Sequence, residues 1–210
     1  LFRGLTPFVA LIPGGLIHTN VAGSTLFAAV SGSSAATTAT VGKITTVELK
    51  QRGYDEGLSL GSLAGAGSLG LLIPPSIVMI IYGVLAEVSI SRLFAAGVLP
   101  GLLVAGLYSA WIALRCTINP ALAPREHDHQ ISKSRALLDL LPVLILIAMV
   151  LGAIYSGLAT PSEAAAVGVL GTLTIVTLLR QMSWRLLRDS LMGAVMASTM
   201  VCTILVAAAF

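Results

Sequence analysis

Two uncharged stretches of membrane length are each interrupted near the middle by residues that disfavour a helix. Residues 4–42 contain no Asp, Glu, Lys or Arg, yet they carry Ser-Gly-Ser-Ser at 31–34. Residues 57–86 are equally free of these charges and are interrupted at 67–76, which includes two adjacent prolines. In hydrocarbon, irregular backbone is tolerated only where protein surrounds it or a water-filled cavity adjoins it. The two breaks therefore predict discontinuous helices around a buried site, an arrangement typical of secondary transporters.

The composition places the chain in a bilayer. It is 56% hydrophobic and 10% charged, whereas soluble domains average about 25% charged residues. The predicted fold class is all-α integral membrane. The basic residues are scattered without interleaved aromatics, which excludes nucleic-acid binding. Cys116 and Cys202 lie in apolar segments and are interpreted as buried small hydrophobes, since neither a disulfide framework nor a metal-ligand spacing is present.

Uncharged windows define the predicted spans, because a membrane-crossing helix needs about 20 apolar residues. The window 57–86 is long for one helix, which fits a break at the two prolines. Ten of the 12 Lys and Arg residues fall in alternate connections, within 43–52, 115–135 and 180–188, and the positive-inside rule assigns these connections to the cytoplasm. The turns 86–92 and 154–162 are then outside. The predicted spans are Gly57–Ala86, Leu93–Leu114, Leu140–Ser162, Ala164–Leu179 and Ser190–Phe210.

The first break predicts a re-entrant hairpin. Residues 8–30 can form one arm, most securely after 13–15, and residues 35–49 can form the return arm. Only 33–42 are uncharged after the break, about 15 Å of helix or half a hydrocarbon core. Its tip would expose hydroxyls and carbonyls near mid-membrane. Such oxygens suit Na⁺, and the N-termini of half-helices suit an anion.

The second break predicts a helix that unwinds at Pro74 and Pro75. A proline has no N–H and clashes with the preceding turn, so carbonyls within 67–73 lose their partners. Ser76 is expected to cap the following half-helix with its hydroxyl. Together, the hairpin tip and the broken helix would form a shell of oxygens. Taken singly, each feature has a simpler interpretation, a proline kink or a small-residue packing surface.

An enzymatic alternative is an intramembrane serine hydrolase. Ser31, Ser33 or Ser34 would be the nucleophile and His18 the base. His18 lies 13 positions before Ser31 on the same predicted helix, about 20 Å away along the axis. The sequence therefore predicts no enzyme, and His18 is expected to be a packed or hydrogen-bonded helix residue.

Two local motifs have structural interpretations. Thr160, Pro161 and Glu163 are typical of a capping box that starts a helix, and residues 183–189 are interpreted as an interfacial lead-in to the last helix. A metal site at His127 and His129 is not favoured, because alternating residues on a polar loop have no further ligand in sequence reach. No transition metal and no cofactor are expected.

Several motifs together resemble one family. The segments 30–36, 53–55, 70–76, 81–83, 89–100 and 159–165 are similar to the large membrane subunit of tripartite ATP-independent periplasmic (TRAP) transporters, and the resemblance covers essentially the whole chain. It implies one half of an inverted-repeat, elevator-type fold. It also implies sodium-driven uptake of an organic acid, a dicarboxylate or a sugar acid, delivered by a periplasmic binding protein, and a small membrane subunit as partner in the bacterial or archaeal inner membrane.

The resemblance also implies a sodium and substrate site between a hairpin tip and a broken helix. Many members have an acidic residue soon after the serine cluster, where this chain has Thr37 and Thr38. A carboxylate or ion carrier without a binding protein is the alternative within transport. The residues to which the site is assigned are Ser31, Gly32, Ser33, Ser34, Gly67, Gly70, Ile73, Pro74 and Ser76.

The expected organisation has seven parts. Because the first residue is Leu1 and the last four residues lie in an apolar run, the chain is expected to be a fragment that lacks a second hairpin and does not transport alone. The parts are a lead-in (1–12), a re-entrant hairpin (13–50), a broken transmembrane helix (56–86), an outer connecting arm (87–97), a scaffold helix (98–118), a cytoplasmic loop (119–134) and the start of a second repeat (135–210).

Overall fold

The computed structural model describes residues 2–124 and 133–209. All regular structure in these two ranges is helical, which confirms the predicted all-α class. Within them, five helical segments are long and apolar enough to cross a membrane: 56–85, 90–118, 136–155, 161–178 and 184–207. The chain divides into two compact units, Leu1–Ala164 and Ala165–Phe210. The loop histidines His127 and His129 lie outside the described residues.

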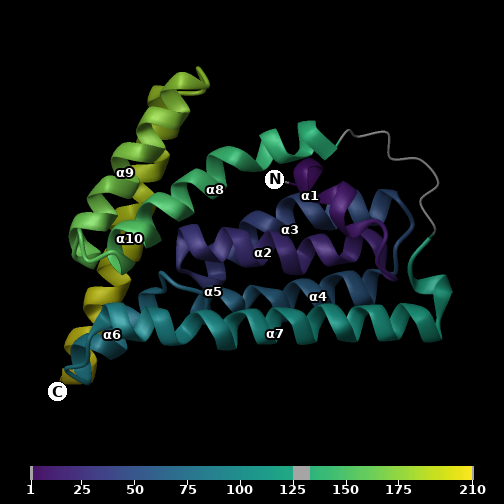
Figure 1. Ribbon diagram of the computed structural model, residues 1–210, viewed down its shortest axis with the longest axis horizontal. Helices are drawn as coiled ribbons and strands as arrows, with labels where there is room; N and C mark the ends of the chain where they lie inside the picture. Colours follow the sequence, from purple (N-terminus) through teal and green to yellow (C-terminus); the bar gives the residue numbers. More distant parts are fainter. Residues whose placement is uncertain (1, 125–132, 210) are drawn as a thin grey trace. The chain divides into compact units, whose positions relative to one another are not determined.

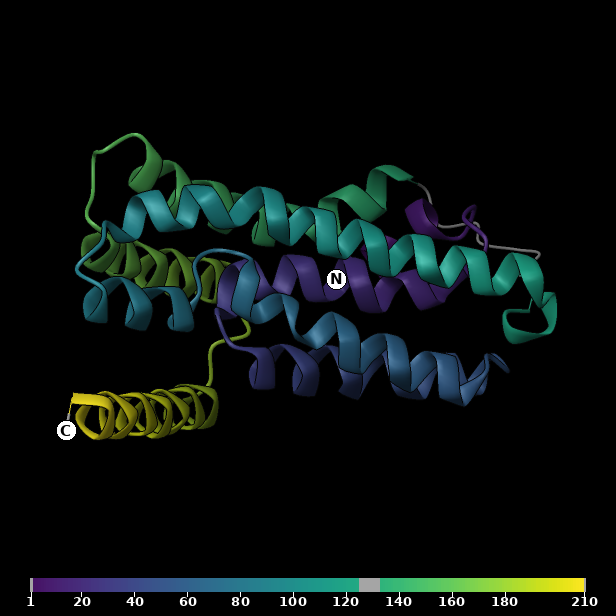
Figure 2. The same cartoon turned by 90° about the horizontal axis from the view of Figure 1, so that it is seen from below.

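The first unit is built around a helical hairpin that packs on a broken helix. The hairpin arms α2 and α3 lie side by side, α4 runs along both, and α7 packs against α2, α4, α5 and α6 (Figures 1 and 2). The helices are α1 (Phe2–Val9), α2 (His18–Ser31), α3 (Ser34–Gln51), α4 (Glu56–Gly67), α5 (Leu69–Leu72), α6 (Ile77–Leu85), α7 (Ile90–Ile118) and α8 (Lys133–Tyr155).

The core of this unit lies where α2, α4, α5 and α7 meet. It contains Leu16, Ile17, Leu69 and Ile112, all almost completely buried. Large apolar side chains elsewhere on α7 remain exposed, as expected of a helix that faces lipid or another subunit.

The first hairpin arm is shorter than the sequence permits. Helix α1 ends at Val9, and the chain turns through Gly14 and Gly15, whose φ angles are 103° and 48°, before α2 begins at His18. Positive φ at both glycines is incompatible with a continuous α-helix. His18 is buried, with its Nε2 2.9 Å from the carbonyl oxygen of Pro13, which agrees with the predicted packing role.

Side-chain caps begin several of these helices. Ser33 accepts a hydrogen bond from the N–H of Ala36 at the start of α3 (3.4 Å), and Asp55 accepts one from Leu58 at the start of α4 (2.7 Å). These oxygens satisfy N–H groups that have no partner within the helix.

The capping box predicted before α9 (Pro161–Leu178) is confirmed. The Thr160 N–H donates to Oε2 of Glu163 at 2.8 Å, and the Glu163 N–H donates back to the Thr160 hydroxyl at 3.4 Å. The second unit comprises the remainder of α9, a short turn and α10 (Trp184–Ala209). The residues interpreted as an interfacial lead-in belong to α10 itself from Trp184 onward.

Candidate functional site

The hairpin tip is a tight, hydroxyl-rich turn between α2 and α3. Gly32 ends α2 with φ 61°, a left-handed conformation that favours glycine, and its N–H donates to the carbonyl of Ala28. The Ser31 hydroxyl lies 3.0 Å from that of Thr37 and accepts a hydrogen bond from the N–H of Ser33 at 3.4 Å. The tip therefore holds its own hydroxyls in a connected group.

The second break leaves several carbonyls without partners. Helix α4 ends at Gly67, α5 forms about one turn, and an irregular segment with a cis Pro74–Pro75 bond precedes α6. Because Pro74 has no N–H, the carbonyl of Gly70 lacks the usual helical donor four residues on. No residue in the described ranges donates a backbone or side-chain hydrogen bond to the carbonyls of residues 72–75. These carbonyl oxygens are free to accept a hydrogen bond from a ligand or to coordinate a cation.

The capping role predicted for Ser76 is wrong. Ser76 does occupy the position before α6, but its hydroxyl makes no cap and donates instead to the carbonyl of Leu71 at 2.8 Å. This bond satisfies a carbonyl that the break had deprived of a helical partner. The backbone of the hairpin tip takes over at the start of α6, because the N–H of Ile77 donates to the Gly32 carbonyl at 3.1 Å.

The tip and the break approach each other through glycines. A Cβ atom on Gly32 would lie 2.6 Å from the carbonyl oxygen of Pro75, and one on Gly70 would lie 2.7 Å from the backbone of Ser33. A Cβ atom on Gly67 would overlap the Thr38 hydroxyl. Only residues without a side chain permit these distances, so the two breaks form one packed unit.

The structure brings the predicted site residues to this junction, with different exposure. Gly32, Gly67, Gly70, Pro74 and Ser76 are buried, whereas the three serines at 31, 33 and 34 are half-buried. The side chain of Ile73 packs toward α7, where a Cβ on Gly101 would lie 2.9 Å from it. Ile73 can therefore contact a ligand at the junction only through its carbonyl oxygen.

Two threonines that were not among the residues predicted for the site also lie at the junction. Thr37 is completely buried beside Ser31, and Thr38 donates to the carbonyl of Ser34 at 2.9 Å while it packs on Gly67. A spacing of four could have indicated Thr37, because it begins a buried stripe on α3 that continues through Val41, Thr45 and Leu49.

Helix ends of opposite polarity meet at the junction. The C-terminal end of α2 carries a partial negative charge, and the N-terminal ends of α3 and α6 carry partial positive charges. None of the junction residues is Asp, Glu, Lys or Arg. The junction can thus offer carbonyl and hydroxyl oxygens to a small cation and helix N-termini to an anion.

A family model covers this arrangement from end to end. Residues 1–210 match the model of the tripartite ATP-independent periplasmic transporter, DctM component. The chain belongs to this family. It is therefore part of a transporter rather than an enzyme, and it is a multi-pass inner-membrane protein, as its apolar helices also indicate.

Individual TRAP permeases are similar over most of the chain. The C4-dicarboxylate TRAP transporter large permease protein DctM of Pseudomonas aeruginosa is 43% identical over 161 residues, 76% of this chain and 37% of that protein. The ectoine/5-hydroxyectoine large permease UehC of Ruegeria pomeroyi is 36% identical, over 87% of this chain and 43% of that protein. The isethionate permease DctMQ of Oleidesulfovibrio alaskensis is 37% identical, over 74% of this chain and 24% of that protein. The chain thus spans less than half the length of these relatives.

Proposed function

We propose that this chain carries one half of the ion and substrate site of a sodium-coupled TRAP importer for an organic acid. The observation on which the proposal rests is the junction of the two breaks, where the Ile77 N–H donates to the Gly32 carbonyl beside the carbonyls of residues 72–75. Hydroxyl and carbonyl oxygens are the ligands that a hard cation prefers. Sodium would bind between the tip and the break.

The helix N-termini supply the reason to propose an acid as substrate. The starts of α3 and α6 lie at the junction, and a carboxylate placed there would interact with their partial positive charges. A bound cation beside the carboxylate would add to the attraction, which is a direct physical route to coupling. The names of the similar permeases include C4-dicarboxylates and isethionate, and also ectoine, so the particular compound is left open within this class.

The glycine contacts support an elevator-type movement. Contacts between backbones join α2, α3, α5 and α6 at the junction. These helices would therefore move as one body, while the scaffold helix predicted at 98–118 remains in place. A periplasmic binding protein and a small membrane subunit are the proposed partners, from the family to which the chain belongs. A carrier that works without a binding protein is the alternative.

The experiment uses the full-length transporter with its partners, reconstituted in vesicles. Ser31→Ala removes a hydroxyl from the junction, whereas the control Thr25→Ala removes one on α2 that donates to the carbonyl of Val21 on the same helix. A hydrogen bond or ligand contact to a charged group contributes about 1.5–3 kcal/mol, so Ser31→Ala should raise the sodium concentration for half-maximal uptake by about tenfold or more. Thr25→Ala should leave it unchanged.

Three outcomes contradict parts of this proposal. If Ser31→Ala and Thr25→Ala show the same sodium dependence and rate, the ion site is not at the junction. If the rate of uptake by the unmodified transporter does not depend on the sodium gradient, the proposed sodium coupling is wrong. Uptake that needs no binding protein favours the alternative carrier.

A further inference from the structure

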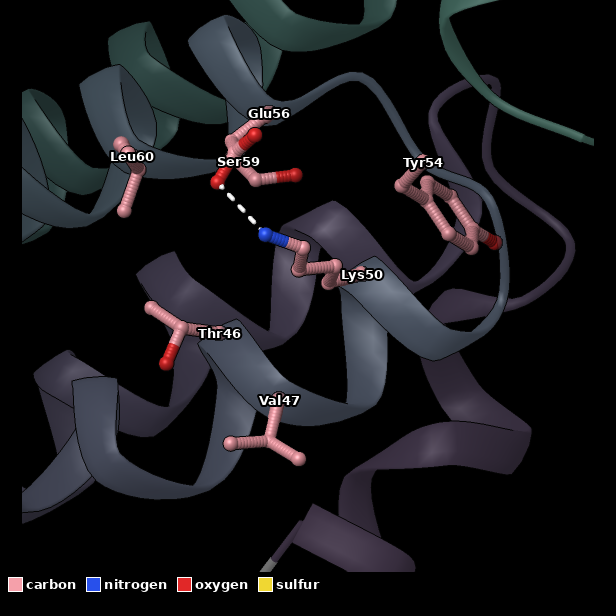
Figure 3. Close-up of a pocket in the computed structure, with 7 residues that line it drawn as sticks. All are labelled: Thr46, Val47, Lys50, Tyr54, Glu56, Ser59 and Leu60. Atoms are coloured by element: carbon pink, nitrogen blue, oxygen red, sulfur yellow. Dashed lines mark hydrogen bonds and ion pairs between the residues drawn. The ribbon is translucent and has the colours of Figure 1, made fainter.

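A pocket lies at the end of the hairpin opposite the tip. It has a volume of about 150 Å³ and is bordered by the last turns of α3 and the first turns of α4 (Figure 3). Thr46 and Lys50 lie 12 and 16 positions after the start of α3, so the pocket is about 18–24 Å along that helix from the tip. It is separate from the proposed ion site.

The charge at this pocket is dipolar rather than of one sign. Lys50 Nζ lies 3.3 Å from Oε1 of Glu56, and the two side chains are 73% and 66% exposed (Figure 3). An exposed pair of this kind contributes little to folding stability. Both side chains can therefore bind another charged group at a small cost in free energy. A ligand that bears one positive and one negative group would match both.

Two aliphatic side chains line the pocket beside this charged pair, together with Thr46, Tyr54 and Ser59. Val47 and Leu60 are 53% and 49% exposed at the pocket, and Ile44, one turn from Val47 toward the tip, is 46% exposed. Exposed aliphatic side chains beside a charged pair form a surface with one polar end and one apolar end. This is the distribution that a lipid presents, with its headgroup at the pair and an acyl chain along α3 and α4.

The depth of the pocket agrees with a lipid headgroup. The segment 56–85 is long and apolar enough to cross a membrane and begins at Glu56, which puts the charged pair at the end of this apolar segment, where a headgroup region would begin. Lys43 and Lys50 lie on α3 and Arg52 directly follows it, and the positive-inside rule assigns this end of the hairpin to the cytoplasm. The volume is below that of pockets for drug-sized ligands, about 300–1,000 Å³, but it is adequate for the end of a headgroup.

We infer that this pocket binds the headgroup of a zwitterionic aminophospholipid from the cytoplasmic leaflet. The lipid phosphate contacts Lys50, its primary ammonium contacts Glu56, and an acyl chain covers Val47 and Leu60. A bound lipid here would hold the start of the broken helix at a constant depth. The inference depends on the membrane location of the chain and not on sodium coupling, so either can fail without the other.

The test compares lipids retained by the full-length transporter in native mass spectrometry. The protein is purified from nanodiscs that contain equal amounts of phosphatidylethanolamine, phosphatidylglycerol and phosphatidylcholine. Phosphatidylethanolamine should be retained in preference to both others. An exposed ion pair contributes about 0.2–1 kcal/mol, so Lys50→Gln and Glu56→Gln should each reduce that retention by up to about fivefold. Lys43→Gln, on the same helix α3 but outside the pocket, should not.

The competing occupants give different patterns. If Glu56→Gln increases retention of phosphatidylglycerol and only Lys50→Gln lowers lipid retention, the site is for an anionic lipid and the inference is wrong. If phosphatidylcholine is retained as well as phosphatidylethanolamine, the ammonium–Glu56 contact is wrong, because a quaternary ammonium has no proton to donate. If neither pocket variant changes retention relative to Lys43→Gln, no lipid binds there.

Discussion

Replacement of Gly32 by alanine tests whether the hairpin tip and the broken helix are packed as one body. Gly32 has φ 61°, and an alanine in the left-handed region costs about 1–2 kcal/mol. The new Cβ would also lie 2.6 Å from the Pro75 carbonyl oxygen, a backbone atom that cannot move without the break moving. Overpacking of this kind costs about 1–3 kcal/mol. The total destabilisation expected for Gly32→Ala is therefore about 2–5 kcal/mol.

The matched control is Gly157→Ala. Gly157 has φ 74°, close to that of Gly32, but within residues 2–124 and 133–209 no heavy atom outside its own chain neighbours lies within 4 Å of the position its Cβ would take. Only the conformational cost of about 1–2 kcal/mol applies there. The difference between the two variants isolates the contact between tip and break.

The assay is thermal unfolding of the full-length transporter in nanodiscs, with sodium-dependent uptake in vesicles as a second readout. Gly32→Ala should melt at a clearly lower temperature than Gly157→Ala and should lose most uptake. Equal melting temperatures and equal uptake for the two variants would refute the packed junction and, with it, the geometry from which the ion site is argued.

Three further predictions concern other contacts of the first unit. Asn20 is completely buried and donates from Nδ2 to the Ser59 carbonyl (2.9 Å) and the Ser62 hydroxyl (2.8 Å). Asn20→Leu removes both hydrogen bonds, although the Ser62 hydroxyl keeps its own bond to the Ser59 carbonyl (2.9 Å), and should destabilise the protein by about 1–3 kcal/mol in the same melting assay. An unchanged melting temperature would contradict this. Tyr54→Phe removes the hydroxyl that accepts from the Leu16 N–H at 3.2 Å, with an expected loss of about 0.5–1.5 kcal/mol, measured against Tyr82→Phe on exposed α6. Thr160→Ala removes the cap of α9, so amide hydrogen exchange at residues 162–164 should accelerate; equal rates in Thr160→Ala and the unmodified protein would show that the cap is dispensable.

Prediction from sequence succeeded where local covalent chemistry dominates. The absence of charge over 57–86 and the missing N–H groups of Pro74 and Pro75 are properties of the chain itself, and they predict a membrane helix that breaks. The Ser-Gly-Ser-Ser turn and the capping box at Thr160 are equally local, because their hydrogen bonds join residues that are close in sequence.

The failures have one physical origin, the competition between local and distant partners. A serine before a helix favours an N-cap, yet Ser76 donates to Leu71, because the break had freed that carbonyl and the tip backbone already serves Ile77. The spacing of buried residues on α3 could indicate that Thr37 is buried but not which group it contacts, and both Thr37 and Thr38 belong to the junction only because α3 folds back onto α2 and α4. The pocket between Lys50 and Glu56 likewise exists only once the two helices are packed.

The sequence by itself determined that this protein is helical, that it lies in a membrane and where its helices must unwind, since each depends on apolar length or on a missing backbone donor. Tertiary structure alone decided which unwound segments face each other and which carbonyl oxygens receive no hydrogen bond from the described part of the chain. That choice depends on glycines at Gly32, Gly67 and Gly70, whose absent side chains let backbones far apart in the sequence come into contact.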